Sequence, residues 1–517
     1  MRIAVNLASK FAALLFILPL LSHAANTPCA IADLQAKAPK DTTILAARVV
    51  PAKDKIPEHC FVEGNVATPG NVVDFHVALP TNWNGKFLFQ GVGGFAGSFA
   101  SLDNSLERGY AAATTDTGHK GTSGRDAAWA LNHRPKEIDF GYRGAHVTTV
   151  AAQKLTTAYF GSKPKYRYFN GCSNGGRMAL MSAQRYPDDY DGIVAGAPGF
   201  GAMGYVRRAG IYQFMLASDE RALPANKLGV LSKAALDACD GSDGVIDGLI
   251  GDPRQCKFDP STVLCKTVDS GDCLTAGQLA TVKRIYSDTK LPDGRTLRGL
   301  PFGHEDMGWS FWNTGPQAPT KQADGRMWFT QEASPIGFQF TDNFFRYVAF
   351  EEDDAKYDWR HFDLNRDLSK IETIAKILSP TDANLTKFGA SGKKLLMYHG
   401  WADPALSAYD SIDYYNNVVA AVGGKDKADD FVRLFLAPGM HHCGGGPGPN
   451  TFDAIAAMEQ WVEKGIAPDK LIASRSDGGK IVRTRPLCPE PQVAKYVGTG
   501  SIDLAENFRC EAPSNRK

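Results

Sequence analysis

The sequence predicts an α/β protein with a mostly parallel sheet and a large inserted segment, and three observations support this prediction. Short apolar strands alternate with helical segments up to about residue 200. The alternation fades from 201 to 389, where Gly-, Cys- and aromatic-rich segments take over, and then resumes. A serine flanked by glycines also stands where an expected strand gives way to an expected helix. Alternating strands and helices form a parallel sheet with helices on both faces.

The expected strands are short, rich in β-branched or aromatic residues and bounded by Pro, Gly or Asn. Before the insertion they cover Asn71–Leu79, Lys86–Gly91, Tyr110–Thr115, Tyr166–Asn170 and Asp191–Gly196. Apolar residues at helical spacing predict helices over Gly144–Phe160 and Arg177–Tyr186. Two more strands, Lys393–Gly400 and Phe431–Leu436, follow the insertion.

Residues 1–24 have the features of a secretory signal peptide. Arg2 and Lys10 supply positive charge, Phe11–Leu21 an apolar centre and Ser22–Ala24 a small-residue cleavage site. The apolar run is shorter than the ~20 residues that a membrane-spanning helix needs. We therefore expect cleavage rather than anchoring, and a periplasmic or extracellular location.

Composition excludes some partners and favours disulfides. The net charge of +1 over 517 residues gives no electrostatic reason to expect nucleic acid or a membrane surface as a partner. Ten cysteines after a signal peptide favour five disulfides. No C-x-x-C or H-E-x-x-H pattern indicates zinc. The sequence does not reveal the oligomeric state.

The serine flanked by glycines is Ser173, in the segment Gly171–Gly176 with the sequence GCSNGG. This pattern is typical of the nucleophile elbow, a strained strand-to-helix turn that exposes a serine hydroxyl above the sheet. The neighbouring Cys172 is a rival nucleophile. We prefer Ser173 because it occupies the position between the glycines.

A serine nucleophile needs a general base and a carboxylate that orients the base. In α/β hydrolases these follow in the order serine, acid, histidine. Asp403 comes just after the strand Lys393–Gly400 and is the expected acid, with Asp410 as its nearest rival. His441 and His442 both follow the next strand, and their spacing alone leaves the choice between them open.

These residues give the chain a specific resemblance. It resembles the tannase/feruloyl esterase family of secreted α/β hydrolases, which also includes enzymes that cleave aromatic diacid monoesters. That family carries Cys-Ser at the elbow and His-Cys at the base, with a disulfide between the two cysteines. Cys172-Ser173 and His442-Cys443 match this signature, with Asp403 between them. The resemblance implies Ser173, Asp403 and His442 as the triad and a Cys172–Cys443 bridge.

Four further disulfides are expected from sequence proximity and from the same resemblance. They join Cys29 to Cys60, Cys239 to Cys256, Cys265 to Cys273 and Cys488 to Cys510.

The oxyanion hole needs backbone N–H donors. Asn174, the residue after the nucleophile, is expected to supply one. The Gly-rich segment Gln90–Phe95 is expected to supply the other, and the resemblance implies Gly94, with Gly93 as the alternative.

An acidic loop in the insertion suggests calcium. Asp240, Asp243 and Asp247 lie within eight residues, and such a density of oxygen ligands suits this hard cation. Without the resemblance a solvated Asp-Gly turn would be the simpler interpretation. With it, these three side chains and the carbonyls of Val245 and Leu249 are implied as ligands of a structural Ca²⁺. No organic cofactor is expected.

The predicted organisation is a catalytic α/β-hydrolase domain over residues 25–200 and 390–517, with a lid over 201–389. The aromatic-rich lid favours a flat acyl group: feruloyl or hydroxycinnamoyl esters first, galloyl esters second, and terephthalate-type monoesters third. The third is placed last because no Arg or Lys could be located beside Phe338, the expected substrate contact. Phe338 could instead belong to the lid's own core. A peptidase and a non-catalytic calcium-dependent binding protein are the alternative functions.

Overall fold

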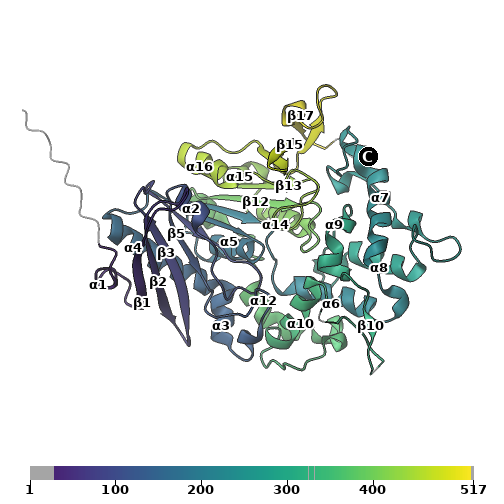
Figure 1. The fold of residues 1–517 in the computed structure, drawn as a ribbon, viewed down its shortest axis with the longest axis horizontal. Coiled ribbons are helices and arrows are strands. Elements are labelled where there is room, and N and C mark those ends of the chain that lie inside the picture. The colour runs from purple at the N-terminus through teal and green to yellow at the C-terminus, as the bar shows by residue number, and fades with distance from the viewer. Residues whose placement is uncertain (1–27, 324, 331, 514–517) are drawn as a thin grey trace, which may run out of the picture.

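The computed structural model describes residues 28–323, 325–330 and 332–513, and its centre is a nine-stranded sheet (Figure 1). The expected signal peptide, residues 1–24, lies outside the described residues. The strand order is β1-β2-β3-β5-β4-β6-β7-β12-β13. The strands are β1 (Thr42–Val50), β2 (His59–Thr68), β3 (Asn71–Pro80), β4 (Lys86–Gln90), β5 (Ala111–Thr115), β6 (Tyr166–Cys172), β7 (Gly192–Gly196), β12 (Lys394–Gly400) and β13 (Val432–Ala437).

The prediction of a mostly parallel sheet is confirmed. The strands from β5 through β4, β6, β7 and β12 to β13 all pair in parallel. β1, β2, β3 and β5 pair antiparallel and extend the sheet on one side. β1 and β2 are not among the predicted strands. β1 forms the edge of the sheet and is largely exposed, so it lacks the buried apolar run that marks the central strands.

Side-chain alternation along the central strands separates two cores. One core contains Phe87, Phe89, Ile193 and Met397, and α4, α5 and α14 pack in it. The second core contains Leu88, Val194 and Leu396, and α16 packs there. These helices are α4 (Gly144–Phe160), α5 (Asn174–Arg185), α14 (Ala408–Ala421) and α16 (Ala454–Lys464). Helices therefore cover both faces of the sheet.

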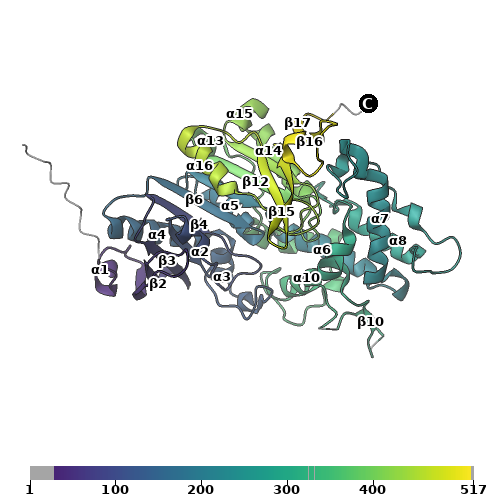
Figure 2. The ribbon, with the colours of Figure 1, turned by 45° about the horizontal axis from the view of Figure 1, so that its top comes forward.

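The segment between β7 and β12 is mostly helical. Figures 1 and 2 both place α7 and α8 at the end of the molecule opposite β1–β3. Its helices are α6 (Ala202–Met215), α7 (Leu228–Cys239), α8 (Ala276–Tyr286), α9 (Glu305–Trp309), α10 (Ile336–Tyr347), α11 (Leu364–Asp367), α12 (Glu372–Leu378) and α13 (Thr386–Ala390). Two short hairpins are β8–β9 (Thr289–Lys290, Thr296–Leu297) and β10–β11 (Thr320–Lys321, Met327–Trp328). α7 and α8 share a small core of their own, while α6 and α10 join the main core.

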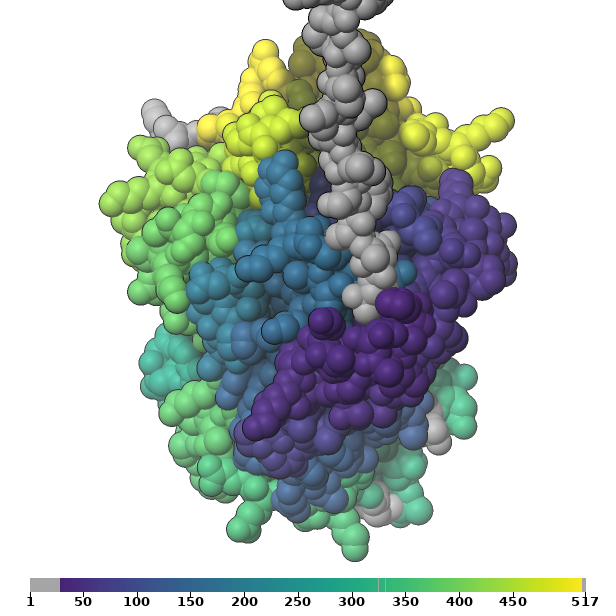
Figure 3. Space-filling view, turned by 90° about the vertical axis from the view of Figure 1, so that its left-hand side faces the viewer, coloured from purple at the N-terminus to yellow at the C-terminus, as the bar shows by residue number. Residues whose placement is uncertain are grey.

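The remaining elements are short helices and two hairpins. α1 (Ile31–Gln35) packs on β1, and Figure 3 shows this N-terminal part in purple on the surface. The others are α2 (Asp103–Glu107), α3 (Arg134–Ile138), α15 (Lys425–Asp429), and the hairpins β14–β15 (Leu471–Asp477, Lys480–Leu487) and β16–β17 (Val493–Tyr496, Phe508–Glu511). Within the described residues, no helix combines the length and apolarity needed to cross a bilayer.

Candidate active site

Ser173 occupies the turn between β6 and α5. Its backbone has φ 63° and ψ −123°, a strained conformation for a residue with a side chain. The turn also needs glycines around it. A Cβ on Gly171 would lie 2.5 Å from the Gly175 carbonyl oxygen, and one on Gly176 would lie 2.3 Å from that of Gly196. The GCSNGG sequence therefore permits the close packing that exposes the Ser173 hydroxyl.

His442 lies on the loop that follows β13, and its ring contacts both expected partners. Its Nε2 is 2.8 Å from Ser173 Oγ, and its Nδ1 is 2.8 Å from Asp403 Oδ2. The adjacent His441 points elsewhere: its Nε2 is buried without a hydrogen-bond partner in the described part of the chain. Of the two histidines that sequence spacing left open, His442 is thus the one beside Ser173.

Asp403 is fully buried on the turn after β12. Its Oδ1 accepts hydrogen bonds from the N–H groups of Ala405, at 2.7 Å, and Leu406, at 3.0 Å. Its Oδ2 lies 3.1 Å from His399 Nε2 in addition to His442. Burial alone would raise the pKa of the Asp403 carboxyl, but the His442 charge and the hydrogen bonds from both imidazoles hold this pKa well below its usual value. The carboxylate is therefore ionised beside the imidazole. The rival Asp410 forms no ion pair or side-chain hydrogen bond within the described residues.

A disulfide joins the two loops that carry Ser173 and His442. Cys172 and Cys443 are bonded, with Cα atoms 5.9 Å apart and a sequence separation of 271. Because each cysteine is the direct neighbour of a site residue, the bond limits how far the hydroxyl and the imidazole can separate.

The other four disulfides tie local segments together. Formation of five disulfides is confirmed, and within the described residues no cysteine is free. The pairs are Cys29–Cys60, Cys239–Cys256, Cys265–Cys273 and Cys488–Cys510. Such bonds persist in oxidising compartments.

Two backbone N–H groups next to Ser173 are available to a ligand. Gly93, Gly94 and Asn174 all line the cavity above the serine. Within the described residues no hydrogen bond uses the N–H of Gly94 or of Asn174. Gly94 has φ +59°, and a Cβ there would lie 2.2 Å from the Gly124 carbonyl oxygen, so only glycine fits this position.

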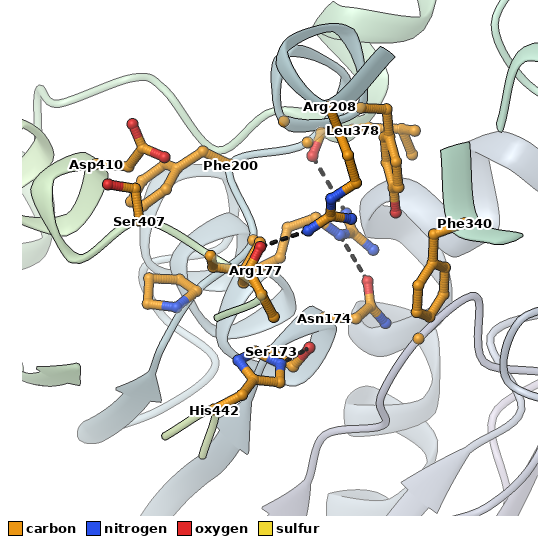
Figure 4. Close-up of a pocket in the computed structure, with 18 of the residues that line it drawn as sticks. Ser173, Asn174, Arg177, Phe200, Arg208, Phe340, Leu378, Ser407, Asp410 and His442 are labelled. Carbon is orange, nitrogen blue, oxygen red and sulfur yellow. Dashed lines mark hydrogen bonds between the residues drawn. The ribbon is translucent and has the colours of Figure 1, made fainter. Parts of the chain in front are cut away.

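The cavity above Ser173 has a volume of about 340 Å³ and is drawn in Figure 4. Aromatic side chains form much of its wall, including those of Phe200, Tyr205, Trp312 and Phe340. The Trp312 ring lies 5.2 Å from the His442 ring, centroid to centroid. A cavity of this size and lining suits a small, flat, mostly apolar ligand.

Phe338 does not line this cavity. It is buried inside the insertion, where its ring packs against Trp328 at 4.8 Å and Tyr212 at 5.3 Å. Two residues separated by two positions on an α-helix lie on nearly opposite faces, because each residue advances the helix by about 100°. α10 therefore turns Phe340 toward the cavity and Phe338 toward the core.

The acidic loop follows α7 and is partly buried. Asp240 accepts hydrogen bonds from the N–H groups of Asp247, at 3.0 Å, and Gly248, at 2.8 Å. Asp247 pairs with Arg485, whereas Asp243 has no ion pair within the described residues. Burial, and then the nearby Asp247 carboxylate, raise the pKa of Asp243 to about 7. The Val245 and Leu249 side chains are buried.

The carboxylates of this loop do not converge on one point. Among the described residues, one trio of His, Cys, Asp or Glu side chains has ligand atoms all within 4.8 Å of one another: Cys265, Asp269 and Cys273. Two of these sulfur atoms are already joined in a disulfide.

Sequence reasoning missed several residues that the fold brings to the site. Arg177, Arg207, Arg208, Trp312 and Phe340 line the cavity, and His399 lies behind Asp403. One signal was available in the sequence: the Arg207-Arg208 pair interrupts a largely apolar helix. The others follow from tertiary contacts alone.

The parallel sheet and the elbow serine beside a histidine–aspartate pair define an α/β hydrolase. A family model for tannase and feruloyl esterase matches residues 60–511, so the chain belongs to the tannase and feruloyl esterase family. It is a carboxylic ester hydrolase.

Two relatives and one solved structure illustrate the similarity. An uncharacterized esterase of Xanthomonas campestris pv. campestris is 35% identical over 94% of this chain and 92% of its own length. The mono(2-hydroxyethyl) terephthalate hydrolase of Piscinibacter sakaiensis is 33% identical over 90% of this chain and 87% of its own. The crystal structure of feruloyl esterase B from Aspergillus oryzae superposes with a TM-score of 0.81, at 26% identity, over 92% of this chain and all of that one (100%).

Proposed function

We propose that this protein is a serine esterase of aromatic acyl esters in which Ser173 forms the acyl-enzyme. The observation that carries the proposal is the 2.8 Å contact between Ser173 Oγ and His442 Nε2, with Asp403 on the other ring nitrogen. This distance is within reach for proton transfer from a nucleophile to a general base.

The reaction then follows from the geometry. His442 takes the Ser173 proton as Oγ attacks the ester carbonyl, and the resulting oxyanion accepts hydrogen bonds from the N–H groups of Gly94 and Asn174. The protonated His442 gives its proton to the departing alcohol, which leaves an acyl-serine. A water molecule, deprotonated by His442, attacks the acyl-serine. His442 then returns that proton to Ser173 Oγ as the bond between Oγ and the acyl group breaks, which releases the acid and restores the hydroxyl. Asp403 keeps the imidazole in the tautomer that accepts the proton at Nε2.

The acyl group is aromatic in this proposal. The rings of Tyr205, Trp312 and Phe340 in the cavity wall support it, since flat apolar groups pack against aromatic side chains. Relatives are named for feruloyl esters and for a terephthalate monoester, and the family name adds tannins. Feruloyl, galloyl and terephthalate-type esters are therefore the three candidate classes.

The acidic loop would hold a structural calcium ion. Its donors are all oxygen, and Asp243 is a half-buried carboxylate that forms no ion pair within the described residues, which fits a hard divalent ion. Asp240, Asp243 and Asp247 would bind through carboxylates, and Val245 and Leu249 through carbonyls. Bound there, the ion supplies positive charge that holds the loop together. No ligand of this set lines the cavity, so the ion takes no part in the ester chemistry.

Residues 201–389 serve as a lid in this proposal, because Arg207, Arg208, Trp312 and Phe340 from this segment cover the cavity while the triad belongs to 25–200 and 390–517. The protein acts outside the cytoplasm, in the periplasm or medium. Five disulfides and the N-terminal signal-like segment support this location.

The test uses the purified mature protein with methyl ferulate, methyl gallate and a terephthalate monoester. We expect hydrolysis of at least one ester, and a loss of roughly 10³-fold or more in kcat for Ser173→Ala with an unchanged circular dichroism spectrum. An aminoacyl p-nitroanilide separates esterase from peptidase. Labelling of Ser173 by a serine-directed phosphonate separates a catalyst from a binding protein. Activity that survives Ser173→Ala would refute the proposal.

A further inference from the structure

Two consecutive arginines of α6 line the cavity above Ser173. Arg207 and Arg208 are 6% and 5% exposed, so both side chains are more than nine-tenths buried. In Figure 4, Arg208 extends from its helix toward the other lining residues, with Ser173 and His442 at the opposite end of the group. The cavity therefore has the reacting serine at one end and cationic groups elsewhere in its wall.

Most of the hydrogen-bonding capacity of this pair is unused. Within the described residues, Arg207 forms no hydrogen bond or ion pair, and its Nη1 is buried without a partner. Arg208 donates from Nη2 to the Ala405 carbonyl oxygen, but its Nε is also buried without a partner. An arginine in a structural role would have its N–H groups satisfied inside the protein.

Arg177 shows what a satisfied arginine looks like in the same cavity. Its Nη2 donates to the Phe140 carbonyl at 2.7 Å, its Nη1 to the Gly141 carbonyl at 2.6 Å, and its Nε to Asn174 Oδ1 at 2.7 Å. Arg207 and Arg208 differ from Arg177 because they line the cavity while most of their N–H groups have no acceptor among the described residues.

The local charge balance is positive. One carboxylate, that of Asp410, shares the cavity wall with the pair, and it forms no ion pair with either arginine in the described part of the molecule. Burial, followed by the neighbouring Arg208, lowers the pKa of Arg207 to about 10. The Asp410 carboxylate offsets part of the Arg207 charge without pairing with it. Burying two adjacent cations is costly, and an anion bound directly to them would lower that cost. Guanidinium groups bind carboxylates in bidentate geometry.

We infer that Arg207 and Arg208 form a carboxylate-binding subsite, so that the preferred substrate is an aromatic ester with a free carboxylate remote from the scissile bond. This inference rests on the proposed esterase function and narrows its substrate class to monoesters of aromatic diacids. It also changes the order expected from sequence, which ranked such esters last because no cation could be placed near Phe338.

The test compares two esters that differ in charge alone. Monomethyl terephthalate and methyl 4-carbamoylbenzoate share the ring, the ester and the methanol leaving group, but one carries a carboxylate where the other has a neutral amide of similar shape. We expect the wild-type kcat/KM to be at least tenfold higher for the carboxylate, mainly through KM. Equal values for the two esters would overturn the inference.

Variants locate the preference. Arg207→Gln and Arg208→Gln should each reduce the ratio of the two kcat/KM values at least tenfold, whereas Asp410→Asn should increase it. The matched control is Arg284→Gln, on α8: Arg284 lies beside Gly210 of α6 but does not line the cavity, and its removal should leave the ratio unchanged. A ratio that survives in both Arg207→Gln and Arg208→Gln would overturn the inference.

A binding measurement separates the subsite from the chemistry. Titration calorimetry on Ser173→Ala should show tighter binding of monomethyl terephthalate than of the amide, and Ser173→Ala/Arg207→Gln should lose this difference. If the wild type hydrolyses no ester and this difference is present, the proposed function fails while the subsite stands. If the wild type hydrolyses an ester but shows no preference for the carboxylate in rate or in binding, the subsite fails while the proposed function stands.

Discussion

At the scale of single residues, the acid of the site has two histidine neighbours instead of one. His399 is fully buried between Asp403 and Ser411, with Nε2 3.1 Å from Asp403 Oδ2 and Nδ1 2.8 Å from Ser411 Oγ. Asp403 thereby receives hydrogen bonds on every side: two from backbone N–H groups and two from imidazoles. His399 touches no reacting atom, so we regard it as a positioning residue for Asp403.

Replacing His399 tests this role. We expect His399→Ala to lower kcat roughly ten- to a hundredfold with little change in KM, because a carboxylate free to rotate no longer fixes the His442 ring. Partial rescue of kcat by His399→Asn, whose amide can still donate to Asp403, would distinguish positioning from packing. If both variants lose the same thermal stability and neither changes kcat, the positioning role is wrong.

At the scale of single elements, the periodicity of α10 assigns different tasks to two phenylalanines. Phe338 packs among the aromatic rings of the insertion, and Phe340 faces the cavity. Phe338→Ala should therefore lower the free energy of unfolding by about 3–5 kcal/mol, as for other buried phenylalanines. Phe340→Ala should lower kcat/KM for aromatic esters about tenfold with a much smaller loss of stability.

Thermal melts and steady-state kinetics on both variants check this assignment, and each protein is the control for the other. A reversed pattern, with Phe338→Ala affecting KM and Phe340→Ala affecting stability, would contradict the orientation of the helix.

The Cys172–Cys443 disulfide is the second element with a testable role. In the chain-entropy model, a bond that closes 271 residues stabilises by about 5.6 kcal/mol, compared with about 2.5 kcal/mol for the bond between Cys265 and Cys273 that closes 8. Cys172→Ala/Cys443→Ala should lose stability and also lower kcat about a hundredfold, because Ser173 and His442 are no longer held together. Cys265→Ala/Cys273→Ala is the matched control and should keep its kcat. Equal kcat in the two variants would show that the first bond has no positioning role.

The elements also differ in how far the sequence could predict them. Strands β4, β6, β7, β12 and β13 are buried apolar runs between turn residues, so local patterns located them within one or two residues. β1 and the C-terminal hairpins β14–β17 lack such runs, and their pairing depends on partners distant in sequence. Motif order predicted the residues beside Ser173. It could not predict that Phe338 faces away from the cavity or that Arg207 and Arg208 line it, because both depend on how the insertion packs.

At the scale of the whole molecule, the acidic loop links the insertion to the C-terminal part of the chain. Arg483 and Arg485, on β15, contact Asp247 of the acidic loop. An ion bound by this loop stabilises only the folded state, so its contribution grows with concentration, reaching about 2.7 kcal/mol at a hundredfold excess over Kd.

We therefore expect added Ca²⁺ to raise the Tm of chelator-treated protein, and Asp243→Asn to abolish that rise. The control is Asp237→Asn, an exposed carboxylate on α7 that is paired with Lys233 and outside the loop. Differential scanning calorimetry with and without Ca²⁺ provides the measurement. A Tm that does not respond to Ca²⁺ in the wild type would remove the ion from the proposed function.

The neighbouring positions of β7 and β12 in the sheet have a consequence for how this enzyme can change over time. The insertion begins after β7 and ends before β12, and these two strands are parallel neighbours in the sheet. Replacing the insertion would therefore leave the strand order unchanged. Arg207 and Arg208 belong to the insertion, whereas Ser173, Asp403 and His442 lie outside it. The triad can thus stay unchanged while the insertion, and with it the substrate preference, is replaced. A chimera that carries the insertion of another family member should acquire that member's substrate preference.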